Sequence, residues 1–245
     1  MTKQKIRVIE LPTGALVIQK IENNTWKKDF SISPIEQNIC STCGHPISPH
    51  EVCSYHSELS GLPIEFSLCY GGYYQSDLNH KPLNEYSKRI QYFNTKDIDL
   101  ILNILIKRWN TLPDKRDYHW ITTIPTRNKA MSKLAKLFAK HFELLYIPCE
   151  DLFNYTSIKS IRYEKKKITR KQLIKDKYSI NLPKLHNTKS RISGNGVIMD
   201  DVLNTGATIS YIMRLLNKHL TLSKVKGLVF ARTKGKKVRY LKFPK

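Results

Sequence analysis

Residues 197–210 read VIMDDVLNTGATIS, and this stretch decides how the rest of the chain is interpreted. Apolar residues run into two acids, Asp200 and Asp201, and a short loop with Gly206 follows. Apolar residues then recur at helical spacing over 208–219, which predicts a helix. The stretch therefore predicts a buried strand that ends in two carboxylates, a glycine-containing loop and a helix.

The same alternation of strands and helices extends outward in both directions. It predicts an α/β fold in which a parallel sheet is flanked by helices on both faces, as in Rossmann-like proteins. Ligands of such sheets bind at the carboxyl ends of the strands. Further strands are expected at 119–124, 144–149 and 225–231, and a further helix at 130–142. A pair of helices is expected within 83–109, and the second helix of this pair would be capped by Asp97 or Thr95.

The loop after the acidic strand has the chemistry of a phosphate cradle. Backbone N–H groups at a helix N-terminus bind phosphate, and Gly206 lets the backbone approach an oxyanion closely. Asp200 and Asp201 can accept hydrogen bonds from the vicinal hydroxyls of a sugar, so the pattern fits a ribose 5-phosphate. The alternative is an ordinary helix capped by Thr208 and two solvated acids. The candidate cradle residues are Leu203, Asn204, Thr205, Gly206, Ala207 and Thr208.

As a whole string, the segment resembles the signature of type I phosphoribosyltransferases, a hydrophobic strand followed by D-D-V-x-x-T-G-x-T. This resemblance implies that Asp200 and Asp201 are the catalytic pair that contacts the ribose hydroxyls of phosphoribosyl pyrophosphate (PRPP), and that residues 203–208 wrap its 5-phosphate. Purine-salvage members carry an acid at the position of Asn204. Because an asparagine cannot act as a general base, a hypoxanthine or guanine enzyme is disfavoured.

The resemblance also implies a pyrophosphate loop after the first strand of the transferase domain. The corresponding residues here are 124–129, IPTRNK, and Thr126, Arg127 and Lys129 are the candidate pyrophosphate ligands. A guanidinium binds phosphate in bidentate fashion, whereas a lysine supplies a point charge. Mg²⁺ is expected with the pyrophosphate. For Lys129, a solvated position in a basic turn is an equal alternative.

Residues 155–191 hold twelve lysines and arginines and two acids, and they occupy the place of the family's mobile hood. The order of Thr169, Gln172, Leu173, Lys177 and Asn181 resembles that of competence protein F-like (ComF-like) phosphoribosyltransferases. A hood would close over the reaction centre and exclude water. A disordered basic linker is the alternative reading of so long a polar stretch.

Four of the five cysteines lie between residues 40 and 69. Cys40-x2-Cys43 and, nine residues later, Cys53-x2-His56 have the spacing of a tetrahedral structural Zn²⁺ site. ComF-like proteins also carry two cysteine pairs before the transferase domain. His45, His50 and Cys69 compete for the fourth ligand position, and isolated Cys149 is expected to be a buried strand residue.

These patterns predict three regions. Residues 1–39 form an N-terminal β-hairpin extension with its turn at 12–14, residues 40–74 a zinc-finger-like module, and residues 75–245 a phosphoribosyltransferase-like domain that includes the basic hood. No run reaches 18 apolar residues and no signal sequence is recognised, so we expect a cytoplasmic protein that is not associated with a membrane.

The chain has 245 residues and carries 42 basic against 20 acidic side chains, a formal net charge of +22. This favours a polyanionic partner, although a lysine-rich proteome would give the same bias. We expect a phosphoribosyltransferase that acts on PRPP with an unidentified acceptor. The alternative is an accessory protein of the competence or defence type that binds single-stranded DNA or RNA, with a helicase as a candidate protein partner. The aromatic residues suited to stack on bases are Tyr155, Tyr163, Tyr178, Tyr240 and Phe243.

Overall fold

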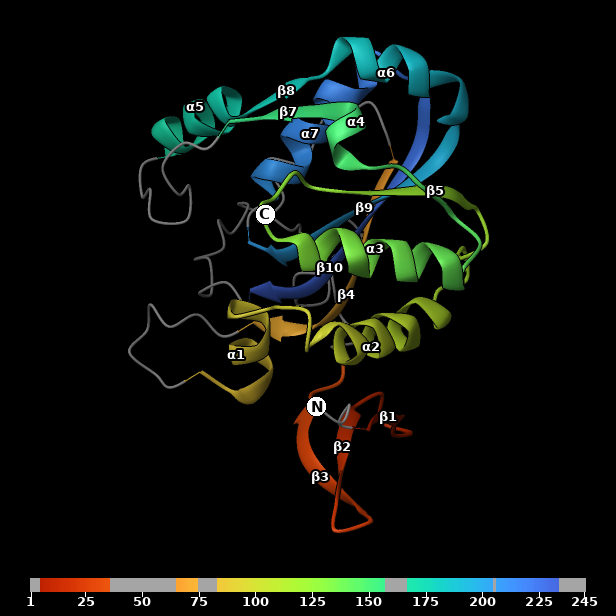
Figure 1. Cartoon of the computed structure of the whole chain (residues 1–245), viewed down its shortest axis with the longest axis vertical. Helices are drawn as coiled ribbons and strands as arrows, with labels where there is room; N and C mark the ends of the chain where they lie inside the picture. The colour runs from red at the N-terminus through yellow and green to blue at the C-terminus, as the bar shows by residue number, and fades with distance from the viewer. Residues whose placement is uncertain (1–4, 36–64, 75–82, 157–166, 205, 234–245) are drawn as a thin grey trace, which may run out of the picture.

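The computed structural model describes residues 5–35, 65–74, 83–156, 167–204 and 206–233 (Figure 1). Strands and helices alternate over most of this range, as the apolar pattern predicts. In chain order the elements are β1 (Ile6–Glu10), β2 (Leu16–Glu22), β3 (Thr25–Ile32), β4 (Glu65–Tyr74), α1 (Glu85–Gln91), α2 (Ile98–Asn110), β5 (Tyr118–Thr123), α3 (Lys129–His141), β6 (Leu145–Tyr146), α4 (Cys149–Leu152), β7 (Phe153–Tyr155), α5 (Lys167–Lys177), β8 (Tyr178–Ile180), α6 (Leu182–Thr188), a 3-10 turn η4 (Lys189–Arg191), β9 (Gly194–Leu203), α7 (Ala207–Asn217) and β10 (Leu222–Thr233).

The central element is a five-stranded sheet with the order β4-β10-β9-β5-β6, and every neighbouring pair in it is parallel. This confirms the predicted parallel sheet flanked by helices and is compatible with a Rossmann-like α/β fold. From β5 the chain moves outward to β6, and it then returns to place β9 on the other side of β5. The strand order therefore reverses between β5 and β9, which is where open α/β sheets bind their ligands.

Each face of the sheet carries its own hydrophobic core. Val197 and Met199 of β9 face the core formed with α2 and α3, whereas Ile198 between them faces the core formed with α7, α4 and α6. This alternation follows from the strand period of two. Figure 1 shows α2 and α3 on one side of the sheet and α7, α4 and α6 on the other. Both faces of this strand are thus buried at its centre, which explains why Val197, Ile198 and Met199 are apolar in succession.

The N-terminal extension is larger than the predicted hairpin. β1 and β2 pair across a turn at 11–15, as expected, and β3 adds a third antiparallel strand. Asn23 and Asn24 form the second turn with positive φ values of 50° and 59°. Adjacent asparagines between two apolar runs are a known signal for this turn, so the third strand was readable from the sequence. We call β1–β3 the N-terminal meander.

Residues 65–74 were expected to be loop material of the cysteine-rich module, and this expectation is wrong. They form β4, an edge strand that pairs with β10 over 150 residues later in the chain. Gly71 and Gly72 allow close packing, because the hydroxyl and ring of Tyr86 occupy the space that a Cβ would need at each glycine. The Tyr86 hydroxyl also donates a hydrogen bond to the Phe230 carbonyl of β10.

The predicted strand at 144–149 is shorter than expected. Only Leu145 and Tyr146 join the sheet, and Cys149 begins α4. Pro148 occupies the N-cap position of α4; it has no N–H to extend the β-ladder. Cys149 is buried, as predicted, although it does not lie in a strand.

Arg108 of α2 joins the N-terminal meander to the sheet. Its guanidinium is 5% exposed and donates hydrogen bonds to the carbonyls of Gly14 (2.9 Å), Ser33 (3.4 Å) and Gly71 (3.3 Å). Leu16 and Ile18 of β2 add fully buried side chains to the same core. The meander is therefore packed into the main hydrophobic core and held there by a buried cation.

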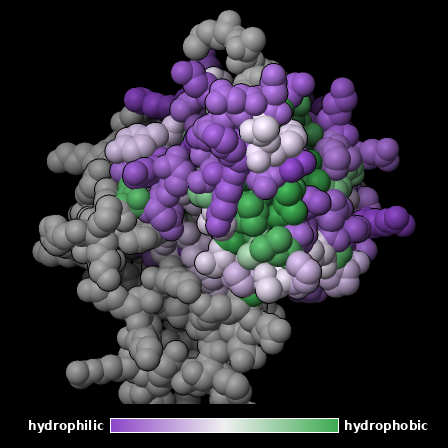
Figure 2. Space-filling model, turned by 90° about the horizontal axis from the view of Figure 1, so that it is seen from below, coloured by the Kyte–Doolittle hydropathy of each residue, from purple (hydrophilic) through white to green (hydrophobic). Residues whose placement is uncertain are grey.

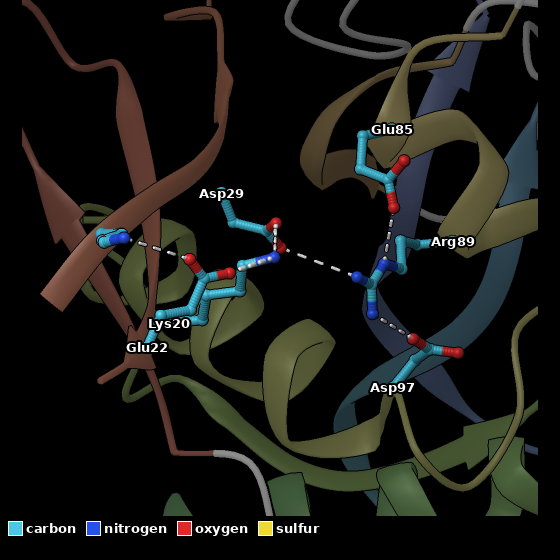
Figure 3. A network of polar contacts seen from close by, with 7 residues as sticks. Lys20, Glu22, Asp29, Glu85, Arg89 and Asp97 are labelled. Carbon is cyan, nitrogen blue, oxygen red and sulfur yellow. Dashed lines mark hydrogen bonds and ion pairs between the residues drawn. The ribbon is translucent and has the colours of Figure 1, made fainter. Parts of the chain in front are cut away.

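An ionic network supports this packing at the surface (Figure 3). Arg89 of α1 lies 3.0 Å from Glu85, 3.2 Å from Asp97 and 3.6 Å from Asp29 of β3. Asp97 occupies the N-cap position of α2, as predicted, but its side chain makes no capping hydrogen bond. Its carboxylate binds Arg89 instead, so the network replaces the expected cap.

A second charged cluster lies at the amino ends of the strands. Lys226 of β10 is 3% exposed, and its Nζ lies 2.9 Å and 3.0 Å from the two carboxylate oxygens of Asp114. Burial raises the pKa of Asp114, but hydrogen bonds from Lys224 and Lys226 outweigh it and lower this pKa to about 2. The cluster joins β10 to the segment before β5.

Among the helices of the described residues, none combines the length and apolar character required to cross a membrane.

We expect Arg108→Lys to lower the free energy of unfolding by about 2–4 kcal/mol, because one ammonium group cannot reach three carbonyls on separate segments and leaves buried acceptors unpaired. Urea unfolding followed by circular dichroism measures this. Lys107→Ala, at an exposed position one residue earlier, is the control and should change stability by less than about 0.5 kcal/mol. Equal stability of the two variants would contradict the proposed role of Arg108.

Candidate functional site

The two predicted ligand loops lie side by side at the carboxyl ends of β5 and β9. Thr123 at the end of β5 pairs with Met199, the residue before Asp200. The N–H of Ile124, which opens the candidate pyrophosphate loop, donates to the Met199 carbonyl at 2.9 Å. The acid pair and the loop after β5 are therefore held next to each other by the sheet, at the point where the strand order reverses.

The acid pair sits where β9 leaves the core. Asp201 is exposed and Asp200 is half-buried. The N–H of Asp201 donates to Asp200 Oδ1 at 2.9 Å, and the N–H of Val202 donates to Asp201 Oδ1 at 2.6 Å. Burial is the main cause that raises the pKa of Asp200 well above its usual value, and the neighbouring charge of Asp201 raises it further. The protein thus holds a carboxylate in an environment that penalises its charge.

The glycine loop opens α7 with the geometry that the sequence requires. Gly206 has a φ of 78° and is the N-cap residue of α7, and its carbonyl accepts the first helical bond from Ser210 at 2.8 Å. Thr208 lies inside the first turn, so the alternative reading in which it caps the helix is wrong. Thr233 at the end of β10 donates from Oγ1 to Asn204 Oδ1 at 3.0 Å, which fixes the side of the loop next to β10. Of the predicted cradle, Thr205 lies outside the described residues.

The loop after β5 is shaped by Asn128. Its Oδ1 accepts from the Ala130 N–H at 3.0 Å as the N-cap of α3, and its Nδ2 donates to the Phe93 carbonyl at 3.0 Å. Its own N–H donates to Thr126 Oγ1 at 3.2 Å. Thr126, Arg127 and Lys129 are exposed around this anchor. Their exposure suits contact with a ligand in solution, and the Asn128 cap fixes the backbone that carries them.

The flanks of the predicted hood are ordered secondary structure. β7 and β8 pair as an antiparallel hairpin, and α5 and β8 contact α7. For residues 167–191 the alternative of a disordered linker is therefore wrong, because Ile174, Tyr178 and Leu185 pack into the second core. Residues 157–166 lie outside the described residues. Figure 1 shows α5 on the side of the molecule toward which the arrowheads of β9 and β10 point.

Lys177 at the end of α5 and Tyr178 at the start of β8 lie near the acid pair. Lys177 Nζ is 5.2 Å from the ring centroid of Tyr155 and 5.4 Å from that of Tyr178, which are cation–π distances. Burial raises the pKa of Tyr178, and the charges of Asp200 and Asp201 contribute to the increase. Lys177 in turn lowers the pKa of Asp200. Lys177 and Tyr178 are thus close enough to the carboxylates to interact with them electrostatically.

Sequence reasoning missed two residues that position this site. Asn128 had a readable signal, because an asparagine directly before a helical apolar pattern is a typical N-cap. Thr233 had none, because its contact with Asn204 arises only when β10 is placed beside β9.

The predicted zinc ligands Cys40, Cys43, Cys53 and His56 all lie outside the described residues, as do the competitors His45 and His50. Cys69, the remaining competitor, is 4% exposed in β4, and burial raises its pKa to about 12. That environment disfavours the thiolate that binds zinc. Among the described residues, no three His, Cys, Asp or Glu side chains come together as a metal-binding group.

The chain was compared with protein-family models, with curated proteins and with solved structures, and none of the three comparisons gave a match.

We expect Asp200→Asn to raise the unfolding temperature of the ligand-free protein at pH 7. The pKa of Asp200 is higher in the folded state than in the unfolded chain, so stability is lost as the pH rises above the unfolded pKa of about 3.9, and the loss is complete above the folded pKa. The gain should vanish below about pH 3.9, where the carboxyl is protonated in both states. Scanning calorimetry across this pH range measures it. Asp117→Asn, an exposed acid before β5, is the control, and an equal gain there would contradict the interpretation.

We expect the full-length protein, purified under reducing conditions, to hold about one zinc ion per chain, because the Cys40, Cys43, Cys53 and His56 spacing fits a tetrahedral site. Elemental analysis after gel filtration measures the metal content. Cys40→Ser combined with Cys43→Ser should lose the zinc, whereas Cys149→Ser should retain it. A wild-type protein that takes up no zinc on reconstitution would refute the site.

Proposed function

We propose that this protein binds PRPP and transfers its phosphoribosyl group to an acceptor, with pyrophosphate as the leaving group. The observation that carries the proposal is the juxtaposition of the acid pair, the glycine loop and the basic loop at the one position where the strand order of the parallel sheet reverses. A sugar diol, a monophosphate and a pyrophosphate require these three kinds of group. We further propose that the fold is of the type I phosphoribosyltransferase kind and that the chain is ComF-like.

In this proposal each segment binds one part of PRPP. Asp200 and Asp201 accept hydrogen bonds from the ribose hydroxyls, and charged hydrogen bonds of this type are stronger than neutral ones. The loop of residues 203–208 surrounds the 5-phosphate at the N-terminus of α7, where backbone N–H groups favour an anion. Arg127, Lys129 and Thr126 bind the pyrophosphate at the N-terminus of α3.

The same oxygens suit Mg²⁺. Carboxylates together with substrate phosphate oxygens form the ligand set that this ion prefers, so Asp200 and Asp201 would hold Mg²⁺ with the ribose hydroxyls and the pyrophosphate. Bound Mg²⁺ would neutralise charge that collects on the leaving pyrophosphate. Asp200 supports the fit, because a desolvated carboxylate next to a second one gains more from a cation than a solvated carboxylate does.

Transfer breaks the bond between the sugar C1 and the pyrophosphate oxygen and forms a bond from C1 to the acceptor. Positive charge develops on the sugar, next to the carboxylates, and negative charge on the pyrophosphate, next to Arg127 and Lys129. Preorganised charges are most effective where water is excluded. The paired β7 and β8 strands, with Tyr155 and Tyr178, supply an aromatic cover beside the carboxylates.

Asn204 limits the class of acceptor. Its Oδ1 is occupied by the Thr233 hydroxyl, so the amide Nδ2 is the group left to face a ligand. A donor at this position suits an acceptor with a carbonyl or another hydrogen-bond-accepting oxygen. It does not suit a reaction in which the protein must remove a ring proton there, which disfavours purine salvage.

Calorimetric titration of zinc-replete protein with PRPP and Mg²⁺ tests the proposal. We expect Asp200→Asn combined with Asp201→Asn to weaken binding by about 1.5–3 kcal/mol for each lost charged hydrogen bond, or about tenfold to over a hundredfold each. Arg127→Ala should weaken it by a similar amount for one bond. Both changes leave the sheet and its cores intact.

Matched controls are available at the amino end of β5, opposite to the carboxyl ends of the strands where the candidate site lies. Asp117→Asn and Arg116→Ala change the charge by the same amounts at exposed positions before β5, and both should bind PRPP as the wild type does. If the wild-type protein does not bind PRPP, or if the controls lose as much affinity as the site variants, the proposal fails. If binding is specific, a screen of acceptors with pyrophosphate release as the readout follows.

A further inference from the structure

The N-terminal meander has two faces of opposite character. Leu16, Ile18 and Ile32 are buried on one face, where Val8 and Phe30 pack beside them in the main core. The strand period of two and the register of β1, β2 and β3 place a different set of side chains on the other face. This set, which we call the outer face, consists of Arg7, Ile9, Val17, Gln19, Ile21, Trp26, Lys28 and Ser31.

The outer face remains open. Trp26, with 37% of its surface exposed, is one of few large apolar side chains of the described residues that are this accessible, and Arg7 and Lys28 are exposed as well. Ile9, Val17 and Ile21 are only partly buried and belong to neither hydrophobic core. Figure 2 views the molecule from the end at which the meander lies and shows a hydrophobic area bordered by hydrophilic residues.

Arg7 and Trp26 form a cation–π stack. The Arg7 guanidinium carbon lies 4.4 Å from the centre of the Trp26 ring, and Arg7 Nε donates to Gln19 Oε1 at 2.7 Å. The three residues come from β1, β2 and β3, so the stack spans the width of the meander. A guanidinium held over an aromatic ring can stack on a base or bind a phosphate.

Charge on the meander is sorted between its faces. The acids Glu22 and Asp29 bind Lys20 and Lys27, and Asp29 also reaches Arg89, all on the side toward α1 (Figure 3). Glu10 pairs with Leu16 and therefore shares the buried face. Within the described meander, the outer face thus carries the cations Arg7 and Lys28 and no acid.

We propose that the outer face of the meander binds single-stranded nucleic acid, with Arg7 and Trp26 stacking on bases and Lys28 contacting phosphate. Aromatic and guanidinium planes combined with cations on an open sheet are the features that bind unpaired bases and their backbone. The complementarity of this acid-free face to a polyanion, within a chain of net charge +22, favours nucleic acid over a neutral or basic protein surface. This site is separate from the proposed PRPP site and does not depend on it.

Titration of the full-length protein with ten-nucleotide oligothymidylate and oligouridylate tests the proposal through tryptophan fluorescence. Trp109 and Trp120 are fully buried, so quenching by a stacked base reports Trp26. We expect Trp26→Ala to weaken binding about fivefold or more, and Arg7→Ala by a similar factor. Affinity should fall as salt is raised.

Lys28→Ala and Lys27→Ala form a matched pair. The two lysines are adjacent and exposed, but Lys27 lies on the opposite face beside Glu22. We expect Lys28→Ala to weaken binding by about threefold or more and to lower the salt slope by about one, and Lys27→Ala to do neither. Equal losses in the two variants, or oligonucleotide binding without tryptophan quenching, would place the nucleic acid elsewhere and overturn the proposal.

Two further outcomes would also overturn it. If the oligonucleotides do not bind, the outer face has no such function. If poly-glutamate of equal length binds as tightly and quenches Trp26 as strongly, the partner is an acidic protein chain instead. The Asp200→Asn, Asp201→Asn variant should bind oligonucleotide like the wild type, which keeps this test separate from that of PRPP binding.

Discussion

The parallel pairing of β9 with β5 on one side and β10 on the other is the constraint on which the candidate site depends. It aligns three strand ends, so that residues about 75 positions apart along the chain become neighbours. The hydrogen bond from Ile124 to the Met199 carbonyl brings the basic loop to the acid pair, and the bond from Thr233 to Asn204 brings β10 to the glycine loop. The register of β9 on β5 is specified by Gly196, because the Trp120 ring occupies the space that a Cβ would need at this position.

The acid pair illustrates a conflict between stability and function. A half-buried carboxylate next to a second one is unfavourable in the ligand-free protein, and the raised pKa of Asp200 expresses that cost. Lys177 of the hood offsets part of it. A sugar diol or a divalent cation would remove the penalty on binding, so strain of this kind favours the liganded state over the free one. The hydrophobic packing of β9 supplies the stability that lets the protein tolerate it.

The N-terminal meander is joined to this fold by a different means. Arg108 satisfies three carbonyls from separate segments, and the ion pairs of Arg89 add a second connection at the surface. One face of the meander therefore packs in the core. All the acids of the meander lie on that side, and none lies on the outer face. The open face retains the stack of Arg7 on Trp26. The two proposed binding surfaces, one at the sheet switch point and one on the meander, each carry basic side chains suited to phosphate, namely Arg127 with Lys129 and Arg7 with Lys28.

The sequence by itself determined the local structure that rests on apolar periodicity and turn chemistry. The strand, loop and helix of residues 197–217, β5 with α3, and the first hairpin follow from it, because neighbouring residues decide those elements. The predictions for residues 65–74 and 148–149 were wrong. In the first segment a glycine pair packs against Tyr86, and in the second a proline ends the strand. Only the tertiary structure decided which strands are neighbours, where the order reverses, that Thr233 holds Asn204, and that Tyr178 of the β7–β8 hairpin lies near Asp200. Those relations depend on pairing between segments far apart in the chain, and the free energy of such pairing comes from the burial of whole faces, which no local pattern contains.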